Sequence, residues 1–176
     1  KFGVSIETGQ ASGLVKKALS LNNVTLIGFH CHVGSQVFES KPFTDASEIM
    51  LKFIADVKEE TGFAADILNL GGGFGVRYTE KDPVISYADK IAEVADIINK
   101  QCAALGIAVP KIMMEPSRSL VGDAGMTLYT VGSVKEITGY KNYVSIDGGM
   151  TDNPRYTLYE SPYTVILASR AEDKKD

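Results

Sequence analysis

Four short segments of the sequence carry residues that can bind an anion or hold a proton, and each follows an apolar run: residues 30–36 (HCHVGSQ), 71–75 (GGGFG), 115–118 (EPSR) and 147–149 (DGG). Glycine backbone can approach a phosphate without obstruction by a Cβ atom. A carboxylate such as Glu115 can hold a protonated ring nitrogen, and Arg118 can grip a phosphate or a carboxylate. The first three segments recur at the spacing of a strand plus a helix, which predicts one binding site built from several loops.

Each of these residues also has a purely structural interpretation. The glycine run can be a tight turn between a strand and a helix, and it departs from the G-x-G-x-x-G dinucleotide pattern. Glu115 and Arg118 can form an ordinary salt bridge at the rim of a barrel. His30 and His32 point to the same face at a strand end, but the sequence offers no convincing third histidine or cysteine ligand, so we expect no metal. The presence of three such loops favours the binding interpretation.

Residues 147–159 are rich in turn-forming types and are expected to form a loop. Arg155 in this segment can bind the carboxylate of a substrate, although a surface salt bridge is the alternative. Tyr159 follows shortly after Arg155 in the sequence.

Alternating strands and helices must position the first three loops. Apolar runs at 24–29, 66–70 and 111–114 are typical of strands buried on both faces. Between them, helical periodicity predicts one helix from a cap at Asp45, with Glu48 as its reciprocal partner, to a stop at Gly62. It predicts another from a cap at Ser86 to a stop at Gly106. A shorter helix is expected over residues 12–20. The inward-facing positions are Ile49, Phe53, Ile54, Val57, Ile91, Val94, Ile98 and Leu105. This order predicts parallel strands joined by crossover helices.

The pattern changes after Arg118. The segments 126–131, 134–137 and 143–146 follow one another with turns but no helix, which predicts an antiparallel β region. We therefore expect one domain over residues 1–125 and the beginning of a second over residues 126–176, with the boundary near Gly125. The last segment, residues 171–176, is expected to be a solvated charge run.

Composition limits the classes of partner. The chain has 176 residues, 44% of them hydrophobic, with a formal net charge of −4 and no concentration of Lys and Arg. We therefore expect no nucleic-acid or membrane partner, while a small anionic ligand fits. Cys31 and Cys102 are far apart in the sequence, which predicts buried thiols in a reducing cytoplasm. Because a closed eight-stranded barrel needs about 250 residues, we expect the chain to be part of something larger.

In order along the chain, the motifs at 30–36, 71–75, 115–118, 147–150 (DGGM) and 152–155 (DNPR) resemble those of the diaminopimelate decarboxylase family, pyridoxal-phosphate enzymes with the alanine racemase-like barrel. The resemblance covers essentially the whole sequence. Ornithine and arginine decarboxylases of the same fold share the histidine-glycine-serine, glycine-loop and Glu-Pro-Gly-Arg types of motif. The H-x-H-x-G-S-Q, DGGM and DNPR segments are typical of the diaminopimelate branch.

The resemblance implies an α/β fold, the later part of a TIM-like (β/α)8 barrel that binds pyridoxal 5'-phosphate, followed by the start of an antiparallel β domain. It implies decarboxylation of meso-2,6-diaminopimelate to L-lysine by a cytoplasmic homodimer with its active sites at the interface. His32 would stack on the cofactor ring, with Glu115 at the ring nitrogen. The implied cofactor-binding residues are His32, Ser35, Gly72, Gly73, Glu115, Ser117 and Arg118. The implied substrate-binding residues are Arg118, Arg155 and Tyr159.

Three departures from the family pattern stand out. Ser117 replaces the glycine of Glu-Pro-Gly-Arg, and we expect its backbone to have an ordinary φ and its hydroxyl to add a donor. Tyr156 replaces a frequent proline after Arg155. The lysine that forms the Schiff base with the cofactor lies in the family upstream of anything present here, so the isolated chain is expected to be inactive. The alternatives are a decarboxylase of the same fold acting on ornithine, arginine or carboxynorspermidine, a noncatalytic relative that binds pyridoxal phosphate, and a phosphate-binding barrel without pyridoxal chemistry.

Overall fold

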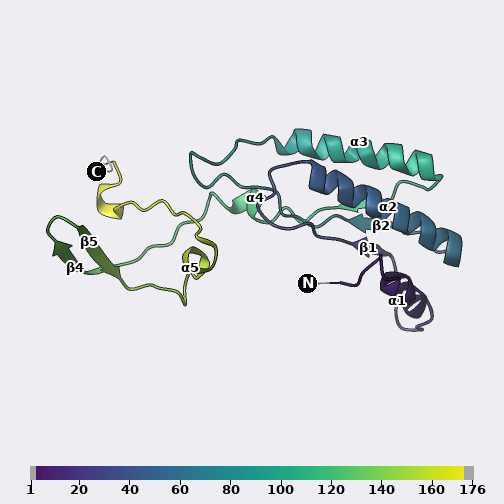
Figure 1. The fold of residues 1–176 in the computed structure, drawn as a ribbon, viewed down its shortest axis with the longest axis horizontal. Coiled ribbons are helices and arrows are strands. Elements are labelled where there is room, and N and C mark those ends of the chain that lie inside the picture. The colour runs from purple at the N-terminus through teal and green to yellow at the C-terminus, as the bar shows by residue number, and fades with distance from the viewer. Residues whose placement is uncertain (1–2, 173–176) are drawn as a thin grey trace. The chain divides into compact units, whose positions relative to one another are not determined.

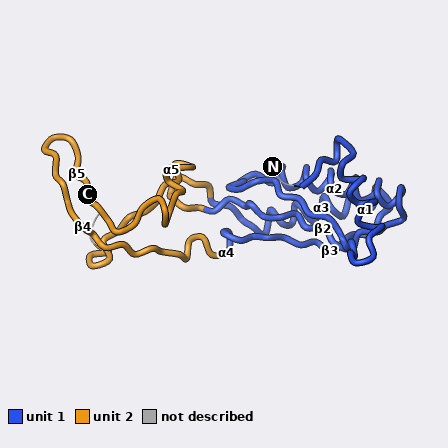
Figure 2. The backbone as a smooth tube through the Cα atoms, turned by 90° about the horizontal axis from the view of Figure 1, so that it is seen from below, with its two compact units in different colours: residues 1–76, 84–120 blue, residues 77–83, 121–176 orange. Residues whose placement is uncertain are grey.

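Figure 1 shows the computed structural model, which describes residues 3–172. The chain forms two compact units (Figure 2): unit 1 comprises residues 1–76 and 84–120, and unit 2 comprises residues 77–83 and 121–176. The expected charge run at 171–176 lies, beyond residue 172, outside the described residues.

Unit 1 is built on a parallel sheet in the order β1-β2-β3, formed by β1 (Gly28–His30), β2 (Ile67–Asn69) and β3 (Lys111–Met113). Helix α2 (Lys41–Thr61) connects β1 to β2, and α3 (Tyr87–Leu105) connects β2 to β3. Helix α1 (Gln10–Leu19) precedes β1 and contacts α2. The predicted parallel strands with crossover helices are therefore confirmed. The strands are shorter than the apolar runs, since β1 begins only at Gly28, although the Ile27 carbonyl accepts hydrogen bonds from the Asp66 and Ile67 N–H groups.

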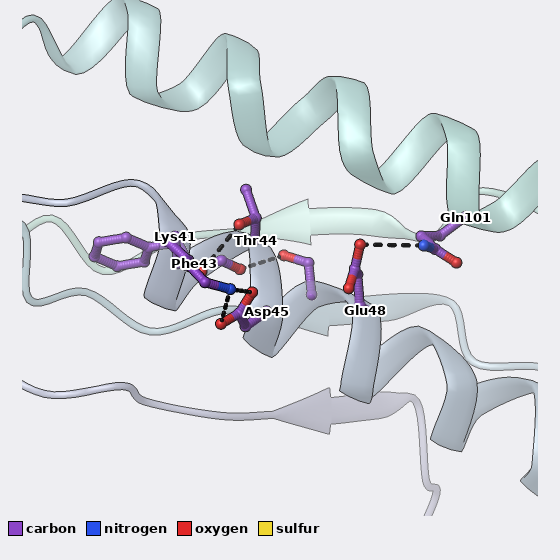
Figure 3. A network of polar contacts seen from close by, with 7 residues as sticks. Lys41, Phe43, Thr44, Asp45, Glu48 and Gln101 are labelled. Carbon is purple, nitrogen blue, oxygen red and sulfur yellow. Dashed lines mark hydrogen bonds and ion pairs between the residues drawn. The ribbon is translucent and has the colours of Figure 1, made fainter.

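The start of α2 differs from the prediction. The helix begins at Lys41 rather than after a cap at Asp45, and Ser40 occupies the N-cap position. Pro42 stands in the first turn, where its fixed φ and missing N–H are tolerated. Asp45 instead lies one turn inside the helix and accepts a hydrogen bond of 2.7 Å from Lys41 Nζ (Figure 3).

The other predicted ends of α2 and α3 are confirmed, whereas α1 begins at Gln10, two residues before the predicted start at Ser12. Gly62 ends α2 with φ 77°, and Gly106 ends α3 with φ 64°, a left-handed conformation that glycine adopts without a Cβ clash. The Ser86 hydroxyl caps α3 by accepting a hydrogen bond from the Asp89 N–H.

The core of unit 1 lies where α2 and α3, which run side by side in Figure 1, pack on the sheet. Phe43 and Phe74 stack with ring centroids 4.4 Å apart. The buried cluster consists of Phe43, Met50, Leu51, Ile54, Leu68, Leu70, Phe74, Val94, Ile98 and Cys102. Ile49 and Ile91, both expected to face inward, are 58% and 45% exposed. The helical period identified the apolar stripe of each helix, but neighbouring elements of unit 1 cover only part of that stripe.

Unit 2 contains an antiparallel hairpin of β4 (Val131–Ile137) and β5 (Lys141–Ile146), which confirms the predicted antiparallel region. Only Val131 of the expected strand 126–131 takes part in the hairpin. The expected loop 147–159 includes a short helix, α5 (Arg155–Tyr159), and a 3-10 turn, η1 (Ala168–Arg170), follows it. Helix α4 (Arg118–Val121) lies at the boundary between the units in the sequence. Among residues 3–172, no helix is long and apolar enough to cross a membrane.

Candidate functional site

Three of the four predicted segments meet at one edge of the unit 1 sheet. The first begins at the last residue of β1, and the other two begin just after β2 and β3. The carboxyl ends of parallel strands share an edge. The Val37 N–H donates to the Gly73 carbonyl and the Gly75 N–H donates to the Val37 carbonyl, each at 2.9 Å. The Glu115 N–H donates to the Gly71 carbonyl at 2.8 Å. Backbone hydrogen bonds thus tie the first loop to the second and the second to the third.

Two glycines allow this close approach. A Cβ atom on Gly72 would overlap the carbonyl oxygen of Glu115, and one on Gly73 would overlap that of Gly34. Gly73 also has φ 101°, which side chains of L-residues rarely tolerate. The glycine run is therefore required for the packing of the three loops, whatever else it binds.

His32 contacts the glycine loop through its ring. Its Nδ1 accepts a hydrogen bond of 3.3 Å from the buried Gly72 N–H. An imidazole nitrogen that accepts a hydrogen bond carries no proton, so the neutral His32 ring has its proton on Nε2. The Gly72 N–H is therefore engaged by His32 in this structure, while the exposed His32 side chain leaves its ring accessible.

The Glu115 carboxylate has two side-chain neighbours. Its Oε1 accepts a hydrogen bond of 2.8 Å from Asn69 Nδ2 and lies 3.6 Å from His30 Nε2. The His30 and Glu115 side chains are 53% and 57% exposed. Asn69 also accepts, through Oδ1, a hydrogen bond of 2.8 Å from the Gly71 N–H.

Asn69 was not among the predicted site residues, since it was counted within the apolar run 66–70. A sequence signal for it exists: a polar amide interrupts the apolar run two positions before the glycines. Asparagine in that position commonly hydrogen-bonds the backbone two residues ahead, as Asn69 does. His30 was singled out in the sequence, but its proximity to Glu115 was not predicted.

Gln36 joins the first two loops more firmly than the sequence indicated. Its Nε2 donates to the Val76 carbonyl and its Oε1 accepts from the Val76 N–H, both at 3.0 Å. Val76 is buried, and the Gln36 backbone has φ 58°. The side-chain amide therefore acts like an additional stretch of β-pairing between the loops.

Ser117 does not have the ordinary backbone that we expected. Its φ is 49°, in the left-handed region that a Cβ atom disfavours. The prediction that this position tolerates a non-glycine residue without strain is wrong, because the turn after β3 needs the conformation that glycine supplies. Ser117 is nevertheless exposed, and Arg118 follows it at the start of α4.

The two cysteines are free thiols; Cys102 is buried, as predicted, whereas Cys31 is only partly buried. Burial raises the pKa of the Cys31 thiol, which lies beside the site, and that of the Cys102 thiol in the core. A raised pKa disfavours the reactive thiolate. Within residues 3–172, no group of three His, Cys, Asp or Glu side chains could hold a metal ion.

The predicted substrate residues Arg155 and Tyr159 lie in unit 2. Helix α5 brings them together, with the Arg155 guanidinium carbon 5.5 Å from the centre of the Tyr159 ring. The Arg155 N–H donates to Asn153 Oδ1 at 3.2 Å, and Tyr163 donates to the same oxygen. In the same unit, Asp147 of the fourth predicted segment accepts a hydrogen bond from the Thr130 N–H, which lowers the pKa of its carboxyl.

The donor set in unit 1 suits a flat heteroaromatic ring that carries a phosphate. The His32 ring offers a stacking surface, and Glu115 offers an acceptor for a ring N–H. Ser35, whose backbone lies close to Gly73, adds a hydroxyl, and Arg118 at the start of α4 adds a guanidinium. Both groups are usual partners of a phosphate group.

The chain is similar to proteins of known family along its whole length. The family model described as "Pyridoxal-dependent decarboxylase, pyridoxal binding domain" matches residues 1–122. The diaminopimelate decarboxylase of Halalkalibacterium halodurans is 45% identical over 99% of the chain, and that of Bacillus subtilis is 40% identical over 100% of it. The chain spans 40% of the length of each of these relatives. A solved structure of M. jannaschii diaminopimelate decarboxylase with L-lysine matches with a TM-score of 0.82 and 34% identity, covering 93% of this chain and 37% of that one.

Proposed function

The chain belongs to the pyridoxal-dependent decarboxylases, and we propose that the protein of which it is part decarboxylates meso-2,6-diaminopimelate to L-lysine with pyridoxal 5'-phosphate as cofactor. The observation that carries the substrate assignment is the identity of 40–45% with diaminopimelate decarboxylases over the whole chain. That similarity includes the DGGM and DNPR segments, which lie beyond the part matched by the family model.

The residues at the sheet edge fit the cofactor. His32 would stack on the ring, and Glu115 would accept a hydrogen bond from the protonated ring nitrogen. Ser35, Ser117 and Arg118, together with backbone of Gly73, would hold the phosphate, and the predicted phosphate contact of Gly72 would form only if its N–H left His32. When bound, pyridoxal phosphate supplies an electron sink for the carbon that loses its carboxylate.

The chain's own residues supply orientation and charge. Glu115 opposes loss of the ring-nitrogen proton, because its carboxylate stabilises the positive charge there. The His32 ring is fixed against the glycine loop by the Gly72 N–H, which limits its rotation under the cofactor. Arg155 and Tyr159 would bind the distal carboxylate of the substrate, and Arg118 would border both phosphate and substrate.

In the whole protein, residues 1–125 form the later part of a TIM-like (β/α)8 barrel and residues 126–176 begin the antiparallel β domain. Homodimerisation would complete the active sites at the interface, in a cytoplasmic enzyme. The lysine that binds the cofactor covalently would come from outside this chain, since no lysine ends β1, β2 or β3: Lys111 begins β3, and Lys135 lies on the antiparallel strand β4. The chain alone would then be inactive.

The test is CO2 release by the complete protein with pyridoxal phosphate, comparing meso-diaminopimelate with L-ornithine and L-arginine. Strong preference for diaminopimelate supports the assignment. Preference for ornithine or arginine would retain the cofactor site and reject the substrate. A protein that binds no pyridoxal phosphate would reject both.

A further inference from the structure

We propose that Asn69 is a positioning residue that aims the Glu115 carboxylate at the ring nitrogen of the cofactor. This inference rests on the proposed function and deepens it, because it assigns a role to a residue outside the set implied by the motifs. Asn69 ends β2 and Glu115 lies just beyond the end of β3, the neighbouring strand. The two side chains meet across this pair of strands, with 2.8 Å between Asn69 Nδ2 and Glu115 Oε1.

The orientation of the Asn69 amide is fixed by its other hydrogen bond, which it accepts from the Gly71 N–H. The Gly71 N–H can only donate, so the oxygen of the amide must face it, as Asn69 Oδ1 does at 2.8 Å. The NH2 group is then turned toward Glu115. A carboxylate oxygen accepts this hydrogen bond, and a bond to a charged group is among the stronger ones.

The other contacts leave Asn69 as the principal side-chain partner of Glu115 within the described chain. His30 Nε2 is 3.6 Å from the same Oε1, beyond ordinary hydrogen-bond distance. The backbone of Glu115 is itself anchored, since its N–H donates to the Gly71 carbonyl. The Gly71 peptide thus contacts both residues of the pair, and Asn69 fixes the remaining side-chain rotation of Glu115.

The test is Asn69→Asp in the complete protein. Aspartate keeps an oxygen for the Gly71 N–H but replaces the donor to Glu115 with a second carboxylate, which repels it. We expect the dissociation constant for pyridoxal phosphate to rise about tenfold, as loss of a hydrogen bond to a charged group predicts. The absorbance spectrum of the bound cofactor should also change, because the partner of its ring nitrogen is displaced.

Gln101→Glu is the matched control. Gln101 Nε2 donates to Glu48 Oε1 at 3.2 Å between α3 and α2 (Figure 3), so the change again places a carboxylate against a glutamate. This pair lies on the helices, away from the sheet edge that carries the site. We expect the dissociation constant for pyridoxal phosphate to stay within about twofold of the wild-type value.

The Asn69→Asp substitution in a Glu115→Gln protein distinguishes a positioning role of Asn69 from a purely structural one. In a Glu115→Gln protein the partner is an amide, which can donate to an aspartate at position 69, so Asn69→Asp should there change cofactor affinity by less than about twofold. Equal effects in both backgrounds, or an Asn69→Asp protein with the spectrum and affinity of the Gln101→Glu control, would overturn the role of Asn69. In either case the wild-type protein would still bind pyridoxal phosphate and release CO2 from diaminopimelate. A wild-type protein that binds no cofactor would instead overturn the proposed function, and the role of Asn69 with it.

Discussion

Each of the two units is stabilised internally by a different kind of interaction. Unit 1 buries a contiguous cluster from two helices and a sheet, in which Leu51 and Leu68 are fully inaccessible. In the described part of unit 2 no residue is buried, and large apolar side chains such as Val134 and Val144 on its hairpin are more than half exposed. Unit 2 owes its conformation to local hydrogen bonds, among them the Asp147 carboxylate on Thr130 and the Asp82 carboxylate on Thr79.

This difference determines which unit can hold side chains at fixed distances from one another. The candidate cofactor residues of unit 1 stand on loops anchored directly to buried strands, so their spacing is set by the core. Arg155 and Tyr159 stand on the short helix α5, none of whose residues is buried. We infer that unit 1 holds its candidate cofactor residues at fixed positions, whereas the conformation of α5 in unit 2 depends on what covers the apolar residues of that unit.

Truncation of a core side chain tests the burial in unit 1. Leu51→Ala removes a fully buried side chain from the centre of α2, and we expect a loss of about 2–5 kcal/mol in the free energy of unfolding. Val144→Ala on β5 should cost less than about 0.5 kcal/mol, as at other exposed positions. Urea unfolding followed by circular dichroism measures both.

The Val144→Ala variant tests whether the hairpin of unit 2 is stabilised by burial. A cost close to that of Leu51→Ala would mean that Val144 is buried in the complete protein, and that the hairpin is stabilised by the same kind of packing as unit 1. Unchanged stability in both variants would contradict the core described for unit 1.

The helix boundaries and the strand order show what the sequence can predict. Ser86, Gly62 and Gly106 were correctly assigned because a cap or a stop depends on a few adjacent residues. Ile49 and Ile91 were wrongly placed inside, because periodicity identifies an apolar stripe but not what covers it. Asp45 was assigned as a cap because its spacing to Glu48 fits that pattern, which Pro42 and the preceding Ser40 override.

The next effect concerns the loops, where unit 1 also relies on side-chain hydrogen bonds. Gln36→Ala leaves both the N–H and the carbonyl of the buried Val76 without their side-chain partner. We expect a loss of about 1–3 kcal/mol in unfolding free energy. Gln36→Glu keeps the acceptor for the Val76 N–H and should lose less. Equal stability of the alanine variant and the wild type would show that the backbone bonds of Val37 suffice to join the loops.

Ser117→Gly should act in the opposite direction. Glycine relieves the cost of a left-handed backbone at φ 49°, partly offset by the greater freedom of glycine in the unfolded chain, so we expect a gain of about 0.5–1 kcal/mol. Ser117→Ala retains the Cβ atom and should give no gain. Thermal unfolding of the two variants measures the difference. A glycine variant less stable than the alanine variant would show that the turn is unstrained.

The site was only partly predictable for a related reason. The motifs identified the loops and most residue types, because glycines and a carboxylate after a strand are visible in a sequence. The φ of Ser117 and the contact of Asn69 with Glu115 depend on how two neighbouring strands align, which arises only when the sheet forms. The roles assigned to the site residues from the motifs remain predictions.

Removal of one carboxylate charge, that of Asp147, tests the local hydrogen bonds of unit 2 and should have a smaller effect than the changes in unit 1. The Thr130 N–H holds the pKa of Asp147 below its ordinary value of about 3.9, so this carboxylate adds stability above that pH. The contribution is lost as the pH falls through the lowered pKa of the folded state, where the carboxyl takes up a proton. In Asp147→Asn the side chain stays neutral, so the variant should be less stable than the wild type at pH 7 and should match it in strong acid.

Urea midpoints of the Asp147→Asn variant and the wild type, measured from pH 7 down to about pH 2, give this difference directly. Glu136→Gln on β4 removes one charge from the same hairpin and controls for net charge. A difference between Asp147→Asn and the wild type that does not shrink on acidification would mean that Asp147 acts through its shape alone. Unit 2 would then depend on packing in the complete protein, as unit 1 does, because a charged hydrogen bond must weaken when its carboxylate is protonated.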